Sequence, residues 1–141
     1  MNANTRASVL VLDDDDPFRG ILVRMLSAAG YAVTDTGNAN DAIKLLDGKP
    51  PFHVLIADVQ MPIFQPHGIN VGNIALNKPN GPKVIYITGR PDQVPNGFIN
   101  TAKTPLLAKP IRPDELIAAI EKALRPAHGA APKDQAPSRV R

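Results

Sequence analysis

Five polar side chains stand directly after short apolar segments of the sequence and could do phosphate or metal chemistry. Asp13 and Asp14 follow one such segment, and Asp58 follows another. Thr88 and Lys109 each follow a further one. Strand packing alone does not predict this coincidence, because a buried strand needs no polar residue at its end. We therefore treat these five residues as one candidate site.

The residue types of this set suit a phosphoryl acceptor. Clustered carboxylates repel one another, so a site that holds several aspartates needs positive charge nearby. Lys109 supplies one cation, and a hard divalent cation such as Mg²⁺ is the natural source of the rest. Asp58 would then have an oxygen nucleophile, a metal ion, a cation and the Thr88 hydroxyl around the transferring group.

The apolar pattern of the chain alternates between strand-like and helix-like segments. Apolar runs predict strands at 9–12, 31–36, 52–57, 84–87 and 106–108. Apolar residues at helical spacing predict helices from Asp16 to about Gly30 and at 38–46, 68–76 and 113–124. The segment 91–103 is ambiguous, since it contains prolines and a glycine that oppose a regular helix.

This order of elements predicts an α/β fold, a doubly wound five-stranded parallel sheet with helices on both faces. Ligands of such sheets bind outside the carboxyl ends of the strands. The five polar residues above stand at carboxyl ends, so the fold would bring them together at one edge of the sheet.

Two further aspartates, Asp15 and Asp16, extend the first acidic pair and have a simpler interpretation. Asp16 followed by Pro17 is typical of a helix start, with a capping carboxylate and proline at the first helical position. We expect capping and solvation, rather than metal binding, to explain both residues.

Composition and charge exclude several classes of protein. The chain of 141 residues has no cysteine, so thiolate metal sites and disulfides are excluded. No apolar run approaches the length of a membrane span, and residues 1–8 contain no signal-like apolar region, so we expect a cytoplasmic protein without membrane contact. Much of the net charge of +3 comes from the segment 126–141, which predicts a solvated, disordered tail rather than a DNA-binding face.

Four motifs, in order and at matching spacing, give the chain a resemblance to a known family. The segments VLVLDDDD, LIADVQMP, VIYITG and LLAKPI resemble the signatures of bacterial response-regulator receiver domains of the CheY-like type. The resemblance covers the segment 8–125, with 1–7 as an N-terminal extension and 126–141 as the tail. It implies a flavodoxin-like receiver fold in a stand-alone, single-domain protein.

The resemblance implies a role for each residue of the site. Asp58 resembles the phosphorylated aspartate, Thr88 the switch hydroxyl and Lys109 its ion-pair partner. For Mg²⁺, Asp14 and Asp58 resemble direct ligands and Asp13 a ligand through water. The carbonyl of Gln60 resembles a further metal ligand. Gln60 and Arg90 also occupy positions that tune the lifetime of the phosphoryl group, and the Lys109–Pro110 bond is expected to be cis.

The implied function is two-component signalling. The phosphoryl donor would be a phosphohistidine of a sensor histidine kinase or a histidine phosphotransfer protein, and the chain would be a phosphoacceptor rather than an enzyme. It would signal by protein–protein interaction or in a phosphorelay, as a monomer or weak homodimer and without binding DNA.

The chain departs from the family pattern at three places. The glycine that usually lies four residues after the Met61–Pro62 pair is Gly68, six residues on, so the loop 63–67 is longer. Leu106 replaces a frequently aromatic switch residue. The segment 90–104 is expected to form only a short or irregular helix. These departures concern the usual output face and leave the chemistry intact.

Two alternatives remain open at this point. The segment Asp13-Asp14-Asp15 also resembles the start of a haloacid-dehalogenase-type phosphatase, in which Asp13 would be the nucleophile, although Thr88-Gly89 stands where that family carries an acidic pair. A receiver-like binding module that is not phosphorylated is the other alternative.

His67 lies in the longer loop near Asp58. We interpret it as an ordinary loop histidine rather than as a functional group.

Overall fold

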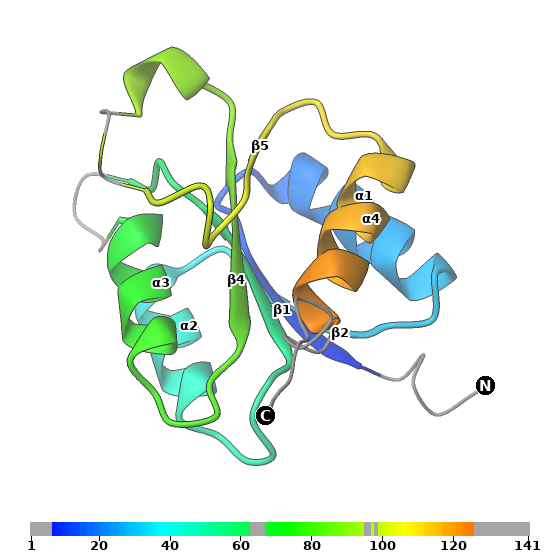
Figure 1. Cartoon of the computed structure of the whole chain (residues 1–141). Helices are drawn as coiled ribbons and strands as arrows, with labels where there is room; N and C mark the ends of the chain where they lie inside the picture. Colours follow the sequence, from blue (N-terminus) through cyan, green and yellow to red (C-terminus); the bar gives the residue numbers. More distant parts are fainter. Residues whose placement is uncertain (1–6, 63–66, 95–96, 98, 126–141) are drawn as a thin grey trace, which may run out of the picture.

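The computed structural model of the protein describes residues 7–62, 67–94, 97 and 99–125. Five strands and four helices alternate along the chain, and a 3₁₀-helix lies between β4 and β5 (Figure 1). The strands are β1 (Ser8–Leu12), β2 (Ala32–Thr36), β3 (Val54–Asp58), β4 (Lys83–Thr88) and β5 (Leu106–Ala108). The helices are α1 (Asp16–Ala28), α2 (Ala39–Leu46), α3 (Gly68–Leu76) and α4 (Pro113–Leu124).

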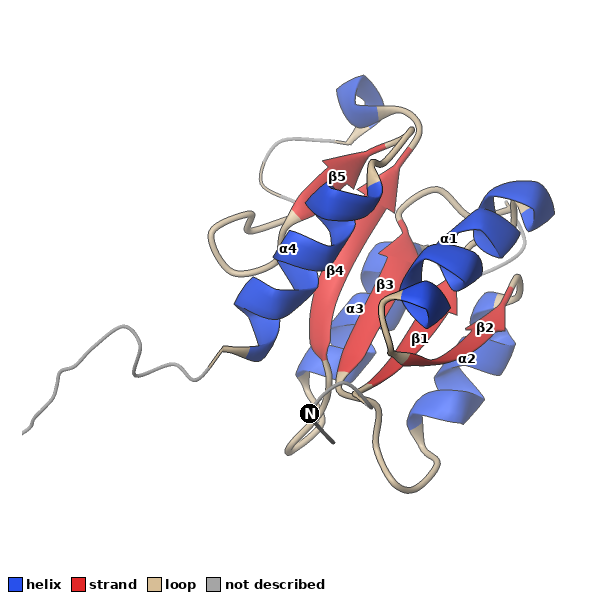
Figure 2. Cartoon of the chain, turned by 90° about the vertical axis from the view of Figure 1, so that its right-hand side faces the viewer, coloured by secondary structure: helices blue, strands red, loops and turns tan. Residues whose placement is uncertain are grey.

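All five strands form one parallel sheet in the order β2-β1-β3-β4-β5. Helices α1 and α4 cover one face, and α2 and α3 cover the other (Figures 1 and 2). The predicted doubly wound α/β fold is therefore confirmed. The strand order reverses between β1 and β3, where the chain crosses from one half of the sheet to the other. Such a switch point is where open α/β sheets bind ligands.

The alternation of side chains along the strands divides the core into two layers. One layer lies between the sheet and helices α1 and α4, and its fully buried members include Val9, Val11, Ile56, Ile85, Ile87, Leu22, Leu26, Leu116 and Ile120. The other lies between the sheet and helices α2 and α3, with Leu10, Leu12, Leu55, Val71 and Tyr86 among its members. Both layers require the three central strands to be apolar on both faces, which explains their continuous apolar runs.

Of two local predictions near the site, one needs correction. The capping residue of α1 is Asp15, whose carboxylate accepts a hydrogen bond from the Phe18 amide at 3.1 Å, and Asp16 is the first residue of the helix. The expectation of a short or irregular helix in 90–104 is confirmed for the described residues, which contain a single 3₁₀ turn at Pro91–Gln93. Two prolines and a glycine leave this segment too few helix-compatible residues for more.

Other local expectations have mixed outcomes. The Lys109–Pro110 bond is cis, as the resemblance implied, and so is Lys49–Pro50. His67 is the exposed residue before α3, while the rest of the longer loop, 63–66, lies outside the described residues. The tail 126–141 and all of the N-terminal extension except Ala7 also lie outside them. None of the helices in the described part of the chain is long and apolar enough to cross a membrane.

Candidate functional site

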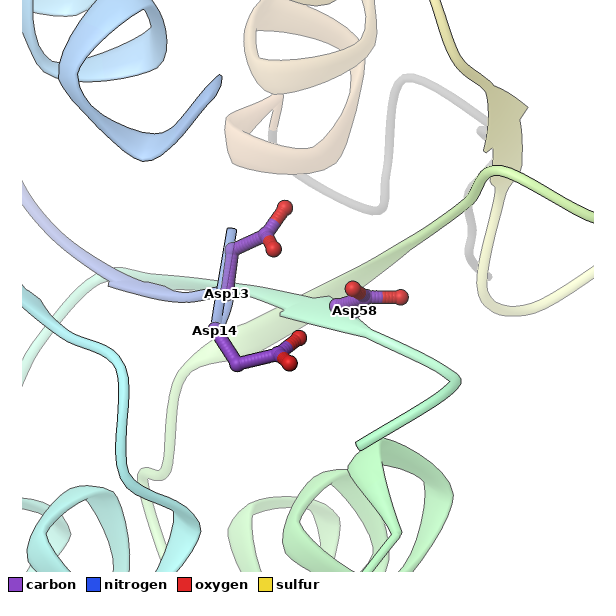
Figure 3. A group of neighbouring side chains, drawn as sticks. All are labelled: Asp13, Asp14 and Asp58. Atoms are coloured by element: carbon purple, nitrogen blue, oxygen red, sulfur yellow. The ribbon is translucent and has the colours of Figure 1, made fainter. Parts of the chain in front are cut away.

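The sheet brings the predicted site residues to one edge. Asp13 and Asp14 directly follow β1, and Asp58 ends the neighbouring strand β3 (Figure 3). Thr88 ends β4 and pairs with Ala108 of β5, so that Lys109 follows immediately beside it. The parallel register alone therefore places all five residues at the carboxyl ends of adjacent strands.

A buried ion-pair cluster lies at the centre of this edge. The side chains of Asp13 and Asp58 are almost fully inaccessible to solvent, whereas Asp14 is exposed. The Lys109 ammonium lies 2.8 Å from Asp13 Oδ2 and 3.2 Å from Asp58 Oδ2. One cation thus bridges two buried carboxylates that would otherwise repel each other.

Backbone amides hold the other oxygen of each buried carboxylate. The Asp15 amide donates to Asp13 Oδ1 at 2.9 Å, and the Gln60 amide donates to Asp58 Oδ1 at 3.1 Å. Each bond closes a local turn in which an aspartate side chain accepts from the amide two residues on. The two carboxylates are therefore oriented by local backbone on one side and by Lys109 on the other.

The environment of Asp58 opposes its ionisation. Burial, followed by the nearby charge of Asp13, raises the pKa of Asp58 to about 7, although the Lys109 ammonium acts in the opposite direction. Burial lowers the pKa of Lys109, but its contacts with Asp13 and Asp58 outweigh this effect and raise that pKa above its ordinary value. Lys109 is therefore a permanent cation, and a single positive charge leaves the acidic cluster incompletely neutralised.

Thr88 is fully buried and makes two hydrogen bonds through its side chain. Its hydroxyl donates to Gln60 Oε1 at 2.6 Å and accepts from the Arg90 amide at 2.9 Å. In the sequence, Gln60 has a predicted metal-ligand role through its carbonyl and a position that tunes the lifetime of the phosphoryl group, but no sequence pattern indicated this side-chain contact. The backbone carbonyl of Thr88 accepts from the Lys109 amide at 2.8 Å, which fixes the two strand ends relative to each other.

Two residues of α1 support the cluster and were not predicted. The Lys109 ammonium lies 4.6 Å from the centre of the Phe18 ring, a cation–π geometry that helps orient the cation. Arg19 donates to the backbone carbonyl of Asp13 at 2.7 Å and pairs with Asp16 and Asp35. In the sequence Phe18 is one apolar residue of a helical pattern, and the three-residue spacing of Asp16 and Arg19 is the signal that could have pointed to a local ion pair.

Gly68 allows α3 to approach the site closely. A Cβ atom at this position would lie 1.8 Å from the backbone carbonyl oxygen of Asp58, which no side chain could accommodate without a shift of the backbone. The Gly68 amide also donates to the carbonyl of Val59 at 3.2 Å. The displaced glycine of the sequence therefore lies against the backbone of the candidate phosphorylation site.

The acidic cluster fits a divalent metal ion. Carboxylate oxygens of Asp13, Asp14 and Asp58 lie within 4.8 Å of one another. Asp13 Oδ2 is buried and, despite its ion pair with Lys109, accepts no well-aligned hydrogen bond among the described residues. Oxygen donors with an excess of negative charge are what Mg²⁺ and Ca²⁺ bind.

Comparison with protein families gives one clear match, and curated proteins agree with it. The model for the response regulator receiver domain matches residues 9–121. The response regulator receiver protein CpdR of Brucella abortus is 32% identical over 117 residues, which cover 82% of this chain and 95% of the relative. The positive alginate biosynthesis regulatory protein of Pseudomonas aeruginosa is 30% identical over 122 residues, but the match spans only 48% of that longer protein.

Solved structures share the fold. A response regulator from Burkholderia pseudomallei, crystallised with a phosphorylated aspartic acid, a calcium ion and citrate, is 26% identical with a TM-score of 0.65 and covers 81% of this chain and 66% of that one. The response regulator TrrA of Thermotoga maritima, in complex with Mg²⁺ and BeF, is 24% identical with a TM-score of 0.69 and covers 84% and 99%. The segment 9–121 that the family model matches begins within β1, ends within α4 and includes every residue of the candidate site. The chain therefore belongs to the response regulator receiver domain family.

Proposed function

We propose that Asp58 accepts a phosphoryl group from a phosphohistidine, with Mg²⁺ bound at the adjacent carboxylates. The observation that carries this proposal is the Lys109 ammonium, held between the buried carboxylates of Asp13 and Asp58 beside the exposed Asp14. The third carboxylate, within 4.8 Å of the other two, gives the site more negative charge than Lys109 neutralises, as a divalent metal site requires. A site that receives a dianionic group next to a metal ion needs all of these charges.

In the proposed transfer, a carboxylate oxygen of Asp58 forms a bond to phosphorus as the bond between phosphorus and the donor's imidazole nitrogen breaks. Lys109 and the Thr88 hydroxyl would each face one oxygen of the transferred group. The Asp58 carboxylate is already held in one orientation by the Gln60 amide, so little reorganisation is needed before attack.

The residues that would hold Mg²⁺ are Asp14, Asp58 and the carbonyl of Gln60, with Asp13 acting through water. Bound there, the ion would supply the positive charge that keeps Asp58 ionised near neutral pH and offsets the charge of the phosphoryl oxygens. The similar structures that contain a calcium ion and Mg²⁺ with BeF support the binding of a divalent ion by this chain.

The proposed partners follow from this chemistry. The donor is a sensor histidine kinase or a histidine phosphotransfer protein, and the chain signals by protein–protein interaction or within a phosphorelay. The receiver unit is proposed to extend over 8–125, and the basic tail 126–141 is not required for phosphorylation. The match with CpdR covers 95% of that relative and 82% of this chain, so the two chains are of comparable size.

A phosphatase with Asp13 as nucleophile is less well supported. Asp13 is fully buried and its two oxygens face Lys109 and the Asp15 amide, which leaves it poorly placed for attack on a substrate. The two hypotheses therefore make opposite predictions for labelling. The phosphoryl group should appear on Asp58 in the proposed function and on Asp13 in a phosphatase. A binding module that is never phosphorylated would show no labelling at either residue.

Phosphorylation with acetyl phosphate and Mg²⁺ tests the proposal. The wild-type protein should gain one acid-labile phosphoryl group, detected by intact mass, and Asp58→Asn should abolish it. Asp14→Ala should slow labelling severely, by about 100-fold, because it removes a direct metal ligand. Asp47→Asn is the matched control, since Asp47 is an exposed aspartate paired with Lys78 far from the site. Labelling of Asp58→Asn at the wild-type rate would contradict the proposal.

A further inference from the structure

The Thr88 hydroxyl has only one proton, and the structure commits it to Gln60. The hydroxyl donates to Gln60 Oε1 at 2.6 Å, a short bond. One of its lone pairs is occupied by the Arg90 amide at 2.9 Å. Because Thr88 is fully buried, water cannot offer the hydroxyl a substitute partner.

A phosphoryl group on Asp58 would compete for the same proton. Phosphoryl oxygens accept hydrogen bonds and donate none, so Thr88 can contact them only as a donor. A hydroxyl with a single proton cannot serve both Gln60 Oε1 and a phosphoryl oxygen in full. Thr88 must therefore leave Gln60 before it can stabilise the phosphorylated state.

We propose that the Gln60 side chain is a latch that holds the Thr88 hydroxyl in the unphosphorylated position and releases it when Asp58 is phosphorylated. This inference rests on the proposed function of Asp58 and adds a positioning role for a side chain, in addition to any role of the Gln60 carbonyl. The latch acts through Thr88 and does not itself touch the phosphoryl group.

The backbone of Gln60 can stay in place while its side chain moves. The Gln60 amide donates to Asp58 Oδ1 at 3.1 Å, which anchors the main chain to the phosphorylation site. Only the side chain connects the residue to Thr88. Release of the latch is therefore a rotamer change rather than a rearrangement of the loop.

A cavity beside Gln60 provides room for the released side chain. It has a volume of about 560 Å³, and its lining includes Gln60, His67, Asn70, Asn73 and Gln93. Three of these neighbours carry carboxamides, which can hydrogen-bond with the Gln60 amide once it has left Thr88. Asn70 and Asn73 are exposed, so water also reaches this side of the cavity and offers the released side chain further hydrogen-bond partners.

Binding of Mg²⁺ with fluoroberyllate to four proteins tests the latch. The proteins are the wild type, Gln60→Met, Thr88→Val and the double variant, all with Asp58 intact. Gln60→Met keeps the length of the side chain and removes the acceptor. It should bind fluoroberyllate about three- to tenfold more tightly than the wild type, the effect of one net hydrogen bond. In the Thr88→Val background, the same substitution should change the affinity less than twofold.

A spectroscopic readout and a matched control complete the experiment. The side-chain amide resonance of Gln60 should shift when Mg²⁺ and fluoroberyllate are added, and Thr88→Val should produce a similar shift without either. Asn77→Met removes an exposed carboxamide at the C-terminal end of α3, outside this cavity, and should leave the affinity within twofold of the wild type.

The possible outcomes are distinct. Equal or weaker binding by Gln60→Met, or the same gain in both Thr88 backgrounds, would overturn the latch while leaving the proposed function intact. A wild-type protein that does not bind Mg²⁺ with fluoroberyllate would instead overturn the proposed function of the site. A gain that appears only when Thr88 is present would establish the latch.

Discussion

The two sides of the candidate site are held together by different kinds of interaction. On one side, Lys109 bridges the buried carboxylates of Asp13 and Asp58. On the other, Thr88 is held by neutral hydrogen bonds from its hydroxyl to Gln60 and from the Arg90 amide. Both sides are buried, and both lie at the ends of strands in the same sheet.

This difference suits the charged side to phosphoryl transfer and the neutral side to the structural response that follows it. Loss of one partner from a buried ion pair leaves an uncompensated charge and costs about 3–5 kcal/mol. One neutral hydrogen bond contributes far less, about 1 kcal/mol net, so exchanging one such bond for another changes the free energy little. The charged side is therefore suited to hold one geometry for phosphoryl transfer, and the neutral side is suited to change when the transfer has occurred.

The largest effect should come from breaking the charged side. Lys109→Met should lower the free energy of unfolding of the metal-free protein at pH 8 by about 2–4 kcal/mol, because it leaves two buried carboxylates without a counter-ion. Thr88→Val should cost only about 1 kcal/mol, since the isosteric side chain loses neutral hydrogen bonds. Urea denaturation of the two variants and the wild type measures both values.

Added Mg²⁺ sharpens this comparison. The ion would replace part of the lost positive charge, so it should restore stability to Lys109→Met more than to Thr88→Val. Equal losses in the two variants, with no difference in the response to Mg²⁺, would show that the two sides are held alike.

The charged side was largely predictable from the sequence, because its arrangement depends on strand order and charge. Asp13, Asp58 and Lys109 each follow an apolar run, and they can meet at one edge of the sheet only if these runs form parallel strands. The family motifs supported the same arrangement. The structure brings these residues together as predicted. Their functional roles remain predictions until phosphorylation is measured.

The neutral side was not predictable in the same way. The bond from Thr88 to Gln60 depends on the rotamers of two side chains that are 28 positions apart, and no periodicity encodes such a contact. The cation–π contact of Phe18 with Lys109 is hidden for the same reason, since an apolar residue on a helix face looks like core. The segment after β4 was correctly expected to resist helix formation, but its 3₁₀ turn depends on tertiary context.

A smaller effect should appear in the pH dependence of stability. The pKa of Asp58 is raised to about 7 in the folded protein, so the folded state binds a proton more tightly than the unfolded state. Without metal, stability should therefore fall as the pH rises from about 4 to 7. Asp58→Asn removes this contribution and should be more stable than the wild type at pH 8, by about 1–3 kcal/mol, but not at pH 4. Thermal melts at both pH values test this, and a difference between the two proteins that does not vary with pH would contradict it.

The smallest effect in energy concerns the segment that follows the neutral side. Between β4 and β5, the described residues of 90–104 form one 3₁₀ turn and a few turn hydrogen bonds, such as those from the amides of Lys103 and Thr104 to the carbonyl of Asn100. Helix α4, by contrast, has a continuous ladder of backbone bonds and two fully buried side chains, Leu116 and Ile120. Segments with few such bonds open at low free energy, so amides of the described residues in 90–104 should exchange with deuterium at least about 100-fold faster than those of 113–124.

Phosphorylation should then slow this exchange, because the Thr88 oxygen that turns from Gln60 toward the phosphoryl group also accepts from the Arg90 amide at the start of the segment. Leu106 cannot provide a ring to fill the space that Thr88 leaves, so a change in order along 90–104 would replace the side-chain exchange expected with an aromatic residue. Hydrogen exchange with and without Mg²⁺ and fluoroberyllate measures the change, with 113–124 as the internal control. If the segment is already as protected as α4 in the free protein, or if its protection does not increase on activation, the neutral side does not transmit the signal through 90–104.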